Sequence, residues 1–202
     1  MRYDKEHKAE THRRVVEAAA RRFRRNGIEA TGVVDLMADA GLTHGGFYAH
    51  FPSKEILVRE AVMSASAQGR RHFQRQIEQA RAEGREPLET IVRQYLTTPH
   101  RDRPDRGCSI AALGAEIARH PRKTREAFTE GLEKTLGLIA SALPAPDRAD
   151  AKDRAIAVFS TLIGALQLSR ALADSDMSQQ ALDAGVKAAL AVGASNLGRS
   201  GH

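Results

Sequence analysis

Residues 42–55, with the sequence LTHGGFYAHFPSKE, concentrate side chains that bind phosphates and the edges of nucleic-acid bases. Hydroxyls, imidazoles and an ammonium group all donate hydrogen bonds to such partners. The adjacent Gly45 and Gly46 have no side chain, so a helix backbone here can come close to base edges and thymine methyls. In an isolated helix each glycine only costs about 1 kcal/mol. This composition therefore predicts a short helix that lies against DNA.

The aromatic and histidine positions of this segment have different expected roles. Phe47 and Phe51 are four residues apart and are expected in the core. Tyr48 points about 100° away from Phe47, which leaves its hydroxyl available for a phosphate. His44 presents a ring nitrogen to a base edge or a phosphate, or it is a capping or solvated histidine. Thr43 is expected to cap the helix and can also contact phosphate.

Cys108 is the single cysteine, so an internal disulfide is excluded and a reducing cytoplasm is the expected compartment. It follows the sequence DRPDRG at the start of a predicted helix. A helix N-terminus and nearby arginines favour the reactive thiolate. Two interpretations stay open: a sensor of oxidants or electrophiles that triggers release from DNA, or a small buried hydrophobe.

Other reactive arrangements do not point to an enzyme. Glu116 and His120 have the spacing of a metal-binding pair on a helix, but no second pair at ligand spacing accompanies them, and ARHP indicates a helix end. The sequence also has no glycine-rich phosphate loop and no nucleophile motif. We therefore expect no catalytic residues, no cofactor and no bound metal.

The elements that must position these groups are all predicted to be helical. Gly27 ends a first helix of about residues 5–26, and Gly41 follows a second of about 33–40. Pro52 limits the third to about residue 51, and Ser53 caps a fourth that extends to about 82. Later helices are expected at about 87–97, 108–119, 121–142, 148–173 and 177–196. The short pair before the fourth helix predicts a helix-turn-helix.

Residues 19–62, AARRFRRNGIEATGVVDLMADAGLTHGGFYAHFPSKEILVREAV, resemble the N-terminal domain of the TetR family of transcriptional regulators. They fit that family's signature AG(V/L)…YxHFxSKExL. The resemblance implies a helix-turn-helix DNA-binding domain at residues 1–53 and a helical-bundle domain for ligand binding and dimerisation at residues 54–202. It also implies that seven residues face DNA: Thr43, His44, Gly45, Gly46, Tyr48, His50 and Lys54.

Two positions depart from the family pattern. Gly32 stands where the family usually has a capping serine or threonine, and Val34 stands where it often has an arginine that faces DNA. The basic first helix is then expected to supply more of the affinity. Residues 1–25 hold nine lysines and arginines and four acidic residues, which leaves a charge of +5. The whole sequence has a net charge of +6, so nearly all of the excess lies in this stretch. Such a concentration of charge fits phosphate binding, although arginines also simply solvate a helix face.

The C-terminal half is expected to mediate dimerisation. Residues 155–172 are apolar on almost every face, as in a helix buried on two sides. One side is expected to face its own bundle and the other a second copy, although a monomeric core helix has the same pattern. The expected interface combines this helix with the last one. Its residues are Leu162, Ala165, Leu166, Ser169, Leu182, Val186 and Leu190.

An effector pocket is expected between the fourth and eighth helices, although each candidate residue also suits an ordinary core. The candidates are Phe73, Ile77, Tyr95, Leu113, Phe128, Leu132, Phe159 and Ile163. The scarcity of aromatic residues argues weakly against a large flat ligand, so we expect a small and largely apolar effector. No apolar run approaches the roughly 18 residues of a membrane span, and no membrane partner is expected.

The whole sequence thus predicts an all-α, homodimeric, cytoplasmic regulator that binds a palindromic operator in double-stranded DNA. The resemblance favours repression, relieved when the effector binds. The rival is a structural nucleic-acid-binding protein without a ligand, which has no need of a helical domain of about 145 residues. Loss of DNA binding on addition of a ligand separates the two.

Overall fold

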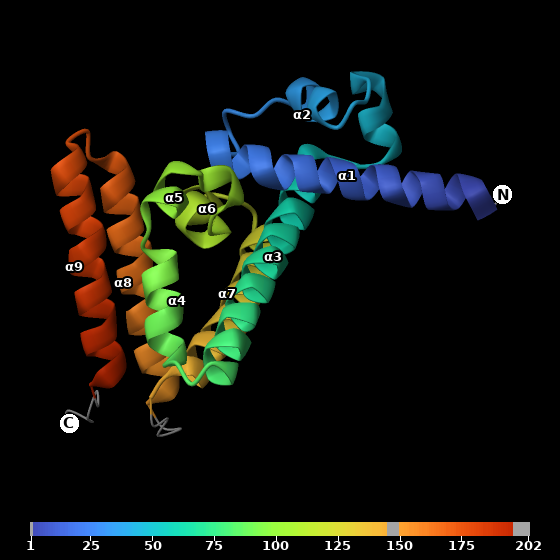
Figure 1. Ribbon diagram of the computed structural model, residues 1–202. Coiled ribbons are helices and arrows are strands. Elements are labelled where there is room, and N and C mark those ends of the chain that lie inside the picture. Colours follow the sequence, from blue (N-terminus) through green and yellow to red (C-terminus); the bar gives the residue numbers. More distant parts are fainter. Residues whose placement is uncertain (1, 145–149, 196–202) are drawn as a thin grey trace. The chain divides into compact units, whose positions relative to one another are not determined.

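The computed structural model describes residues 2–144 and 150–195, and within these ranges it contains helices and no strand, which confirms the all-α prediction (Figure 1). Among the described residues, none of the helices combines the length and apolar character needed to cross a membrane. The elements, in chain order, are α1 (Arg2–Asn26), α2 (Val33–Asp39), η1 (His44–Ala49), α3 (Lys54–Ala82), α4 (Pro87–Tyr95), α5 (Thr98–Asp102), η2 (Pro104–Arg106), α6 (Ser109–Ile117), α7 (Arg122–Ala142), α8 (Ala151–Ala171) and α9 (Ser175–Ala194).

Glycines end the helices where the sequence predicted. Gly27, Gly41 and Gly84 have φ angles of 87°, 72° and 65°, the left-handed region in which a side chain is strained. Each follows a helix directly or by one or two residues. Ser53 accepts a hydrogen bond from the backbone N–H of Ile56 at 3.3 Å, which confirms it as the cap of α3.

One connection is more ordered than the sequence indicated. The stretch PHRDRPDRG was expected to be a break between helices, but it contributes most of α5 and all of η2. Thr97 starts α5 because its hydroxyl accepts from the backbone N–H of His100, and a proline in the first turn is compatible with a helix start. Gly69 does not interrupt α3, since a single glycine is tolerated within a long helix.

The chain divides into two compact units. The first comprises the residues up to Gln68 together with Pro104–Gly131, and the second comprises Gly69–Arg103 together with the residues from Leu132 on. The core of the first unit joins α1, α2, η1 and the first part of α3, and Leu113, Ile117 and Phe128 pack into it. The helix-turn-helix therefore shares its core with α6 and α7, well beyond residue 53.

The second unit is built on α8 and α9, which run side by side (Figure 1). Gly185 lies so close to Ala165 and Leu96 that no side chain fits there, and Gly193 is equally close to Leu88. Arg154 is 1% exposed, lies 3.2 Å from Asp150, and donates to the Gly193 carbonyl at 3.3 Å. These contacts fix how α9 lies on its neighbours.

Candidate nucleic-acid interface and effector site

The turn between α2 and η1 is held by its own backbone and by α1. Gly41 donates to the Ala38 carbonyl at 2.9 Å and Leu42 to the Met37 carbonyl at 2.8 Å, a pattern that ends a helix at a left-handed glycine. Arg14 on α1 donates to the Ala40 carbonyl at 2.7 Å. These bonds give α2 and η1 the fixed relation of a helix-turn-helix.

The inner face of η1 is anchored by the aromatic pair expected in the core. Phe47 and Phe51 are buried and stack with ring centroids 5.5 Å apart. The ring of His12 stacks on Phe51 at 4.3 Å, and its Nε2 lies 2.6 Å from a Glu60 oxygen. The core prediction for Phe47 and Phe51 is thus confirmed, and the histidine stack is an addition that sequence spacing does not reveal.

The outer face of η1 carries most of the residues predicted to face DNA. Tyr48 is 70% exposed, Thr43 and Gly45 are exposed, and Gly46 is half-buried. The element is a 3-10 helix rather than the α-helix that the spacing suggested, and Thr43 precedes it without a side-chain capping bond. The side chain of His44 lies outside what the structure describes.

The fold itself does not require the two glycines of η1. Neither Gly45 nor Gly46 has a positive φ. A Cβ added at Gly45 meets no atom within 4 Å, and one at Gly46 makes only ordinary contact with Met37 and Thr43. Glycine is less favourable than alanine in a helix, so contacts within the described structure do not explain why these two positions lack a side chain.

His50 and Lys54 lie at the far end of the segment. His50 is half-buried, its Nδ1 has no hydrogen-bond partner in the described structure, and its ring centroid is 6.4 Å from that of His12. Loss of water around the ring lowers the pKa of His50, and the charges of Lys8 and His12 lower it further. Lys54 donates from Nζ to the Ile28 carbonyl at 2.8 Å, so part of its donor capacity is used within the chain.

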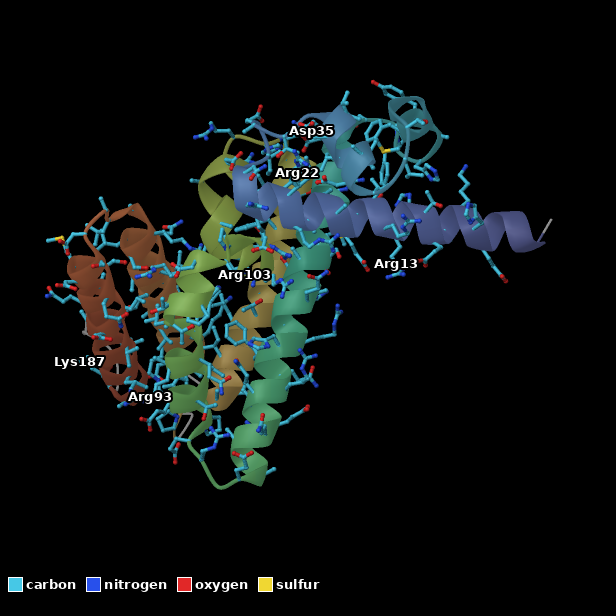
Figure 2. All side chains as sticks on the ribbon, turned by 45° about the horizontal axis from the view of Figure 1, so that its top comes forward. Arg13, Arg22, Asp35, Arg93, Arg103 and Lys187 are labelled. Carbon is cyan, nitrogen blue, oxygen red and sulfur yellow. The ribbon has the colours of Figure 1, made fainter. Side chains whose placement is uncertain are left out.

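Much of the positive charge on α1 is paired inside the molecule. Arg13 contacts Glu10 and Glu17, and Arg22 lies 2.6 Å from Asp39 and 3.7 Å from Asp35 (Figure 2). Arg24 is buried and donates to the Asp105 carbonyl, and its burial lowers its pKa. Among the described residues of α1, the basic residues Lys8, Arg21 and Arg25 are exposed and form no ion pair or hydrogen bond with another side chain. The net charge of the sequence therefore overstates what this helix offers to phosphate.

The departures from the family pattern are visible on α2. Gly32 precedes the helix without any side-chain capping bond. Val34 is 61% exposed, so its side chain is presented to solvent where an arginine was expected. This surface of the first unit is accordingly uncharged at Val34 and along η1.

The loop before α2 is positioned by a residue that sequence reasoning assigned differently. The Glu116 carboxylate accepts from the backbone N–H groups of Ile28 and Glu29 at 2.8 and 3.2 Å. A Cβ added at Gly27 lies 2.9 Å from Glu116 Oε1, so this glycine is required for the approach as well as for its φ. His120, considered as a metal partner of Glu116, instead bonds Glu55 at 3.0 Å. No spacing rule predicts a contact from α6 back to this loop.

The predicted pocket residues divide between the two units. Leu113 and Phe128 belong to the core of the first unit, whereas the other six lie in the second. Phe73, Tyr95 and Phe159 form a cluster with ring centroids 6.0–6.3 Å apart. The structure thus brings the aromatic candidates of the second unit together around α3, α4 and α8.

Four of the residues expected at a dimer interface lie in the core of the second unit. Leu162, Leu166, Ser169 and Leu182 are buried by their own chain, because α8 and α9 pack on each other through these positions. Ala165, Val186 and Leu190 are half-buried. The exposed positions on α8 include a series spaced four apart, at Ile156, Ser160, Gly164 and Leu168, and those on α9 include Ala184, Ala188 and Ala191.

Cys108 precedes α6 as its N-terminal capping residue and is half-buried. Arg24 on α1 donates to the carbonyl of Asp105, three residues before Cys108 in the chain. The role of Cys108 as a sensor stays a prediction.

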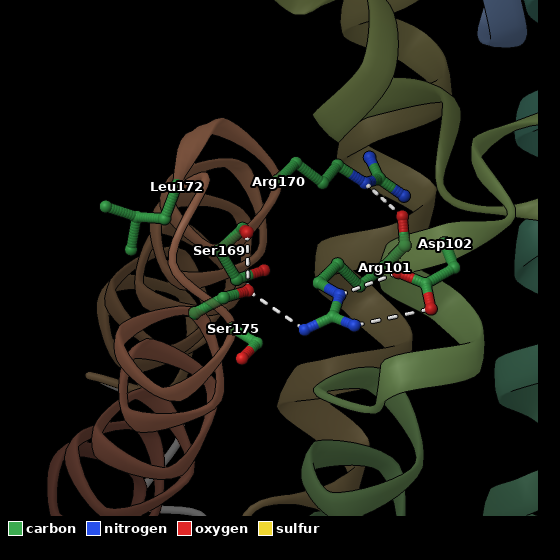
Figure 3. Close-up of a pocket in the computed structure, with 7 residues that line it drawn as sticks. Arg101, Asp102, Ser169, Arg170, Leu172 and Ser175 are labelled. Carbon is green, nitrogen blue, oxygen red and sulfur yellow. Dashed lines mark hydrogen bonds and ion pairs between the residues drawn. The ribbon is translucent and has the colours of Figure 1, made fainter.

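The second unit contains a hollow of about 220 Å³ where α5 meets the ends of α8 and α9 (Figure 3). Arg101 donates to the Ser178 hydroxyl at 2.9 Å, and Ser178 donates to the Ser169 carbonyl at 2.6 Å. Arg170 donates to the carbonyls of His100 and Arg101 at 2.8 and 3.0 Å. Both arginines thus hold α5 onto the α8–α9 pair.

Known proteins are similar to this chain both in the sequence of the helix-turn-helix segment and in the fold. Residues 15–61 match the family model described as bacterial regulatory proteins, tetR family. The regulators YfiR of Bacillus subtilis, itself uncharacterised, and TtgR of Pseudomonas putida are 32% and 39% identical over 74 and 59 residues. These stretches are 37% and 29% of this chain, and they span only 36% and 28% of the length of the two relatives.

The fold similarity extends over nearly the whole chain. A TetR transcriptional regulator from Chloroflexus aurantiacus J-10-FL has a TM-score of 0.68 and 26% identity, covering 93% of this chain and 96% of that one.

Proposed function

Since the chain is a member of the TetR family, we propose that it is a DNA-binding transcriptional regulator, acting in the cytoplasm as a repressor on a palindromic operator. Proteins of this family are transcriptional regulators rather than enzymes. We propose that the protein binds DNA as a homodimer and that a small, largely apolar effector releases the homodimer from the DNA. No cofactor takes part.

The observation that carries this proposal is the pair of bare backbone positions at Gly45 and Gly46. They lie on a short helix that is anchored from behind by Phe47 and Phe51 and carries Tyr48 exposed at its side. The fold does not need Gly45 and Gly46, and their lack of side chains lets the surface of a partner come close to the helix backbone. The major groove of DNA, which admits a helix and displays base edges and thymine methyls, fits that requirement.

Thr43, Tyr48, His50 and Lys54 are the proposed side-chain contacts around these glycines, and His44 is kept among them from the sequence. Hydroxyls and an ammonium group suit phosphate oxygens, which fix the register of a protein on the duplex. Val34 adds an apolar group on α2 that can meet a thymine methyl. Few of these groups are charged, so we expect a modest dependence of operator affinity on salt.

The proposed dimer uses the exposed stripes of α8 and α9. A stripe in which residues four apart are apolar or small allows two helices to approach closely, as at Ile156, Gly164 and Leu168. The half-buried Ala165, Val186 and Leu190 border it. A symmetric pair of such chains presents two recognition helices, and half-sites about 34–36 Å apart match their symmetry.

The test is footprinting of the full-length protein on the DNA that flanks its own gene, repeated over a salt series. A protected palindrome of two half-sites is the expected result, and the Gly45→Ala variant is expected to lose it. Weak protection without a boundary, equal for the wild type and the variant, would contradict sequence-specific binding. Sedimentation of the free protein measures the dimer in the same preparation.

A second way of relieving repression is favoured by the position of Cys108 beside the buried Arg24. A thiol that adds to an electrophile at this point disturbs the contact between α1 and the loop that precedes α6. Treatment of the protein–DNA complex with N-ethylmaleimide is expected to release the wild type and to leave Cys108→Ser bound. Equal release of both proteins excludes this role.

A further inference from the structure

Gln76 is a buried amide in the second unit whose two ends have different surroundings. The side chain lies on α3 and is 6% exposed. Its Nε2 is 2.8 Å from His72 Nε2 and also donates to the Gln94 carbonyl oxygen. Its Oε1 is buried and has no hydrogen-bond partner in the described structure. A buried acceptor in this condition is unusual, because folded proteins pair nearly all such groups.

The two bonds to Nε2 define one orientation of the amide. Loss of water and the charge of Arg75 lower the pKa of His72, which favours a neutral ring whose Nε2 can accept a hydrogen bond from the amide. Gln94 accepts the second amide hydrogen. In this arrangement both hydrogens are used, so Oε1 is left as an acceptor without a donor among the described residues.

Residues next to Gln76 on α3 and next to Gln94 on α4 form an aromatic cluster. Phe73 is three residues before Gln76 on the same face of α3, and Tyr95 directly follows Gln94 on α4. The Phe73 and Tyr95 rings stack at 6.0 Å, with Phe159 edge-on to both. Oε1 itself is buried, whereas His72 and Gln94, which hold the amide, are exposed. The buried acceptor is therefore held by two exposed side chains, and the aromatic cluster neighbours it along both helices.

We propose that the second unit binds an aromatic small molecule that carries a hydroxyl or amine group, whose hydrogen is donated to Gln76 Oε1 while its ring packs against Phe73 and Tyr95. This inference rests on the proposed function only in naming that molecule as the effector. It narrows the expected effector from a largely apolar compound to one with a single essential hydrogen-bond donor.

The experiment compares two probes of similar shape, phenol and anisole, on the full-length protein without DNA. Anisole is the more apolar of the two and has no donor, so a plain apolar site prefers it. Titration calorimetry or ligand-observed NMR is expected to give phenol at least a tenfold lower dissociation constant than anisole, because a buried acceptor rejects a ligand that leaves it unpaired.

Variants at Gln76 connect that preference to Oε1. Gln76→Met keeps the size of the side chain and removes the acceptor, and it is expected to abolish the preference for phenol. Gln76→Glu keeps an acceptor at the same place and is expected to retain the preference, which allows the test even where the methionine variant folds poorly. Gln79→Met, at an exposed glutamine of the same helix, is the control and should behave as the wild type.

Three results would overturn the inference. In the first, the wild type binds phenol no better than anisole. In the second, Gln76→Met still prefers phenol. In the third, neither probe binds the wild type, which leaves Oε1 without a ligand of this class. Operator binding by the same preparations is measured separately, so a regulator that binds DNA and ignores phenol loses only this inference.

Discussion

Gly27 and Gly45 lie in the same compact unit, yet the structure requires only one of them. Gly27 has a positive φ and touches the Glu116 carboxylate, so both its backbone angle and its lack of a side chain are determined by the fold. Gly45 has neither a positive φ nor a neighbour within 4 Å of an added Cβ. The difference separates a glycine that the fold requires from one that the fold leaves free, which is the position proposed to approach DNA.

The same separation holds for the segments around these glycines. The loop of residues 27–31 is bonded from α6 through Glu116, from α3 through Lys54, and internally through the Thr31 hydroxyl to the Gly27 carbonyl. The outer face of η1 has no comparable set of internal bonds. Variants in the loop should therefore change stability first, and variants in η1 should change DNA binding first.

Gly45→Ala should produce the largest effect, and it should appear in binding alone. A methyl group on each of two recognition helices is expected to weaken operator binding by about 3 kcal/mol in total, or roughly 10²-fold, because it separates the backbone from the base edges. The free energy of unfolding should rise by about 0.5 kcal/mol, since alanine restricts the unfolded chain. Gel-shift titration and urea unfolding measure the two quantities, and unchanged affinity contradicts the proposed contact.

Gly27→Ala should have the opposite signature. A side chain at a φ of 87° is strained, and its Cβ lies 2.9 Å from Glu116 Oε1, so we expect a loss of about 2 kcal/mol in unfolding free energy. Gly84→Ala is the control for strain alone, because that glycine also has a positive φ but no neighbour within 4 Å. If the unfolding free energy falls no more for Gly27→Ala than for Gly84→Ala, the Glu116 side chain moves away from the new methyl group without loss of stability.

Glu116→Gln tests the bond itself with little change in shape. A charged acceptor on two backbone N–H groups is replaced by a neutral one, and we expect a loss of about 1 kcal/mol in unfolding free energy. Glu126→Gln, at an exposed carboxylate paired only with Arg122 in the same helix, should change stability much less. Chemical denaturation of both variants gives the comparison, and equal losses remove the special role of Glu116.

Lys54→Ala joins the two regions, because its ammonium group bonds the loop at Ile28 and is also a proposed phosphate contact. Loss of one phosphate contact from each subunit of the proposed dimer should lower the salt slope of operator binding by about two. A variant that loses stability while the salt slope stays unchanged assigns Lys54 to the loop alone. Affinity measured at four or more salt concentrations distinguishes these outcomes.

His50 should give the smallest effect, through the dependence of stability on pH. Because burial and nearby charges lower its pKa in the folded chain, the unfolded chain takes up a proton more readily. Stability is therefore lost as pH falls through about 6.5, the ordinary pKa of histidine, toward the lower folded value. Urea unfolding from pH 8 to 5.5 should show a weaker pH dependence in His50→Gln than in the wild type. Equal dependence in both proteins contradicts a lowered pKa.

The helices could be predicted largely because local rules determine where they end. Gly27, Gly41 and Gly84 adopt the backbone angles that few other residues tolerate, and the Ser53 hydroxyl caps α3. The order within residues 97–106 could not be predicted, since it depends on the Thr97 cap and on Arg170 donating to α5 from a distant helix. Nor does apolar spacing reveal that η1 is a 3-10 helix.

The candidate site was predictable where residue type alone suffices. The glycines, Tyr48 and the aromatic anchor of η1 could be identified from their types and spacing. The partners of charged groups could not, because an arginine has the same sequence signature whether it faces phosphate or pairs with a carboxylate, as Arg13 and Arg22 do. Likewise, Leu162, Leu166 and Leu182 look identical in sequence whether their own chain or a second copy covers them.

The glycines of α9 have a consequence for how duplicated genes of this type can diverge. At Gly185 and Gly193 any larger residue collides with Ala165, Leu96 or Leu88, so the inner side of the last helix tolerates little drift. The outward Ala184, Ala188 and Ala191 carry no such constraint. If the proposed dimer uses this face, two daughter genes could acquire separate partner preferences through outward substitutions while each product keeps its fold.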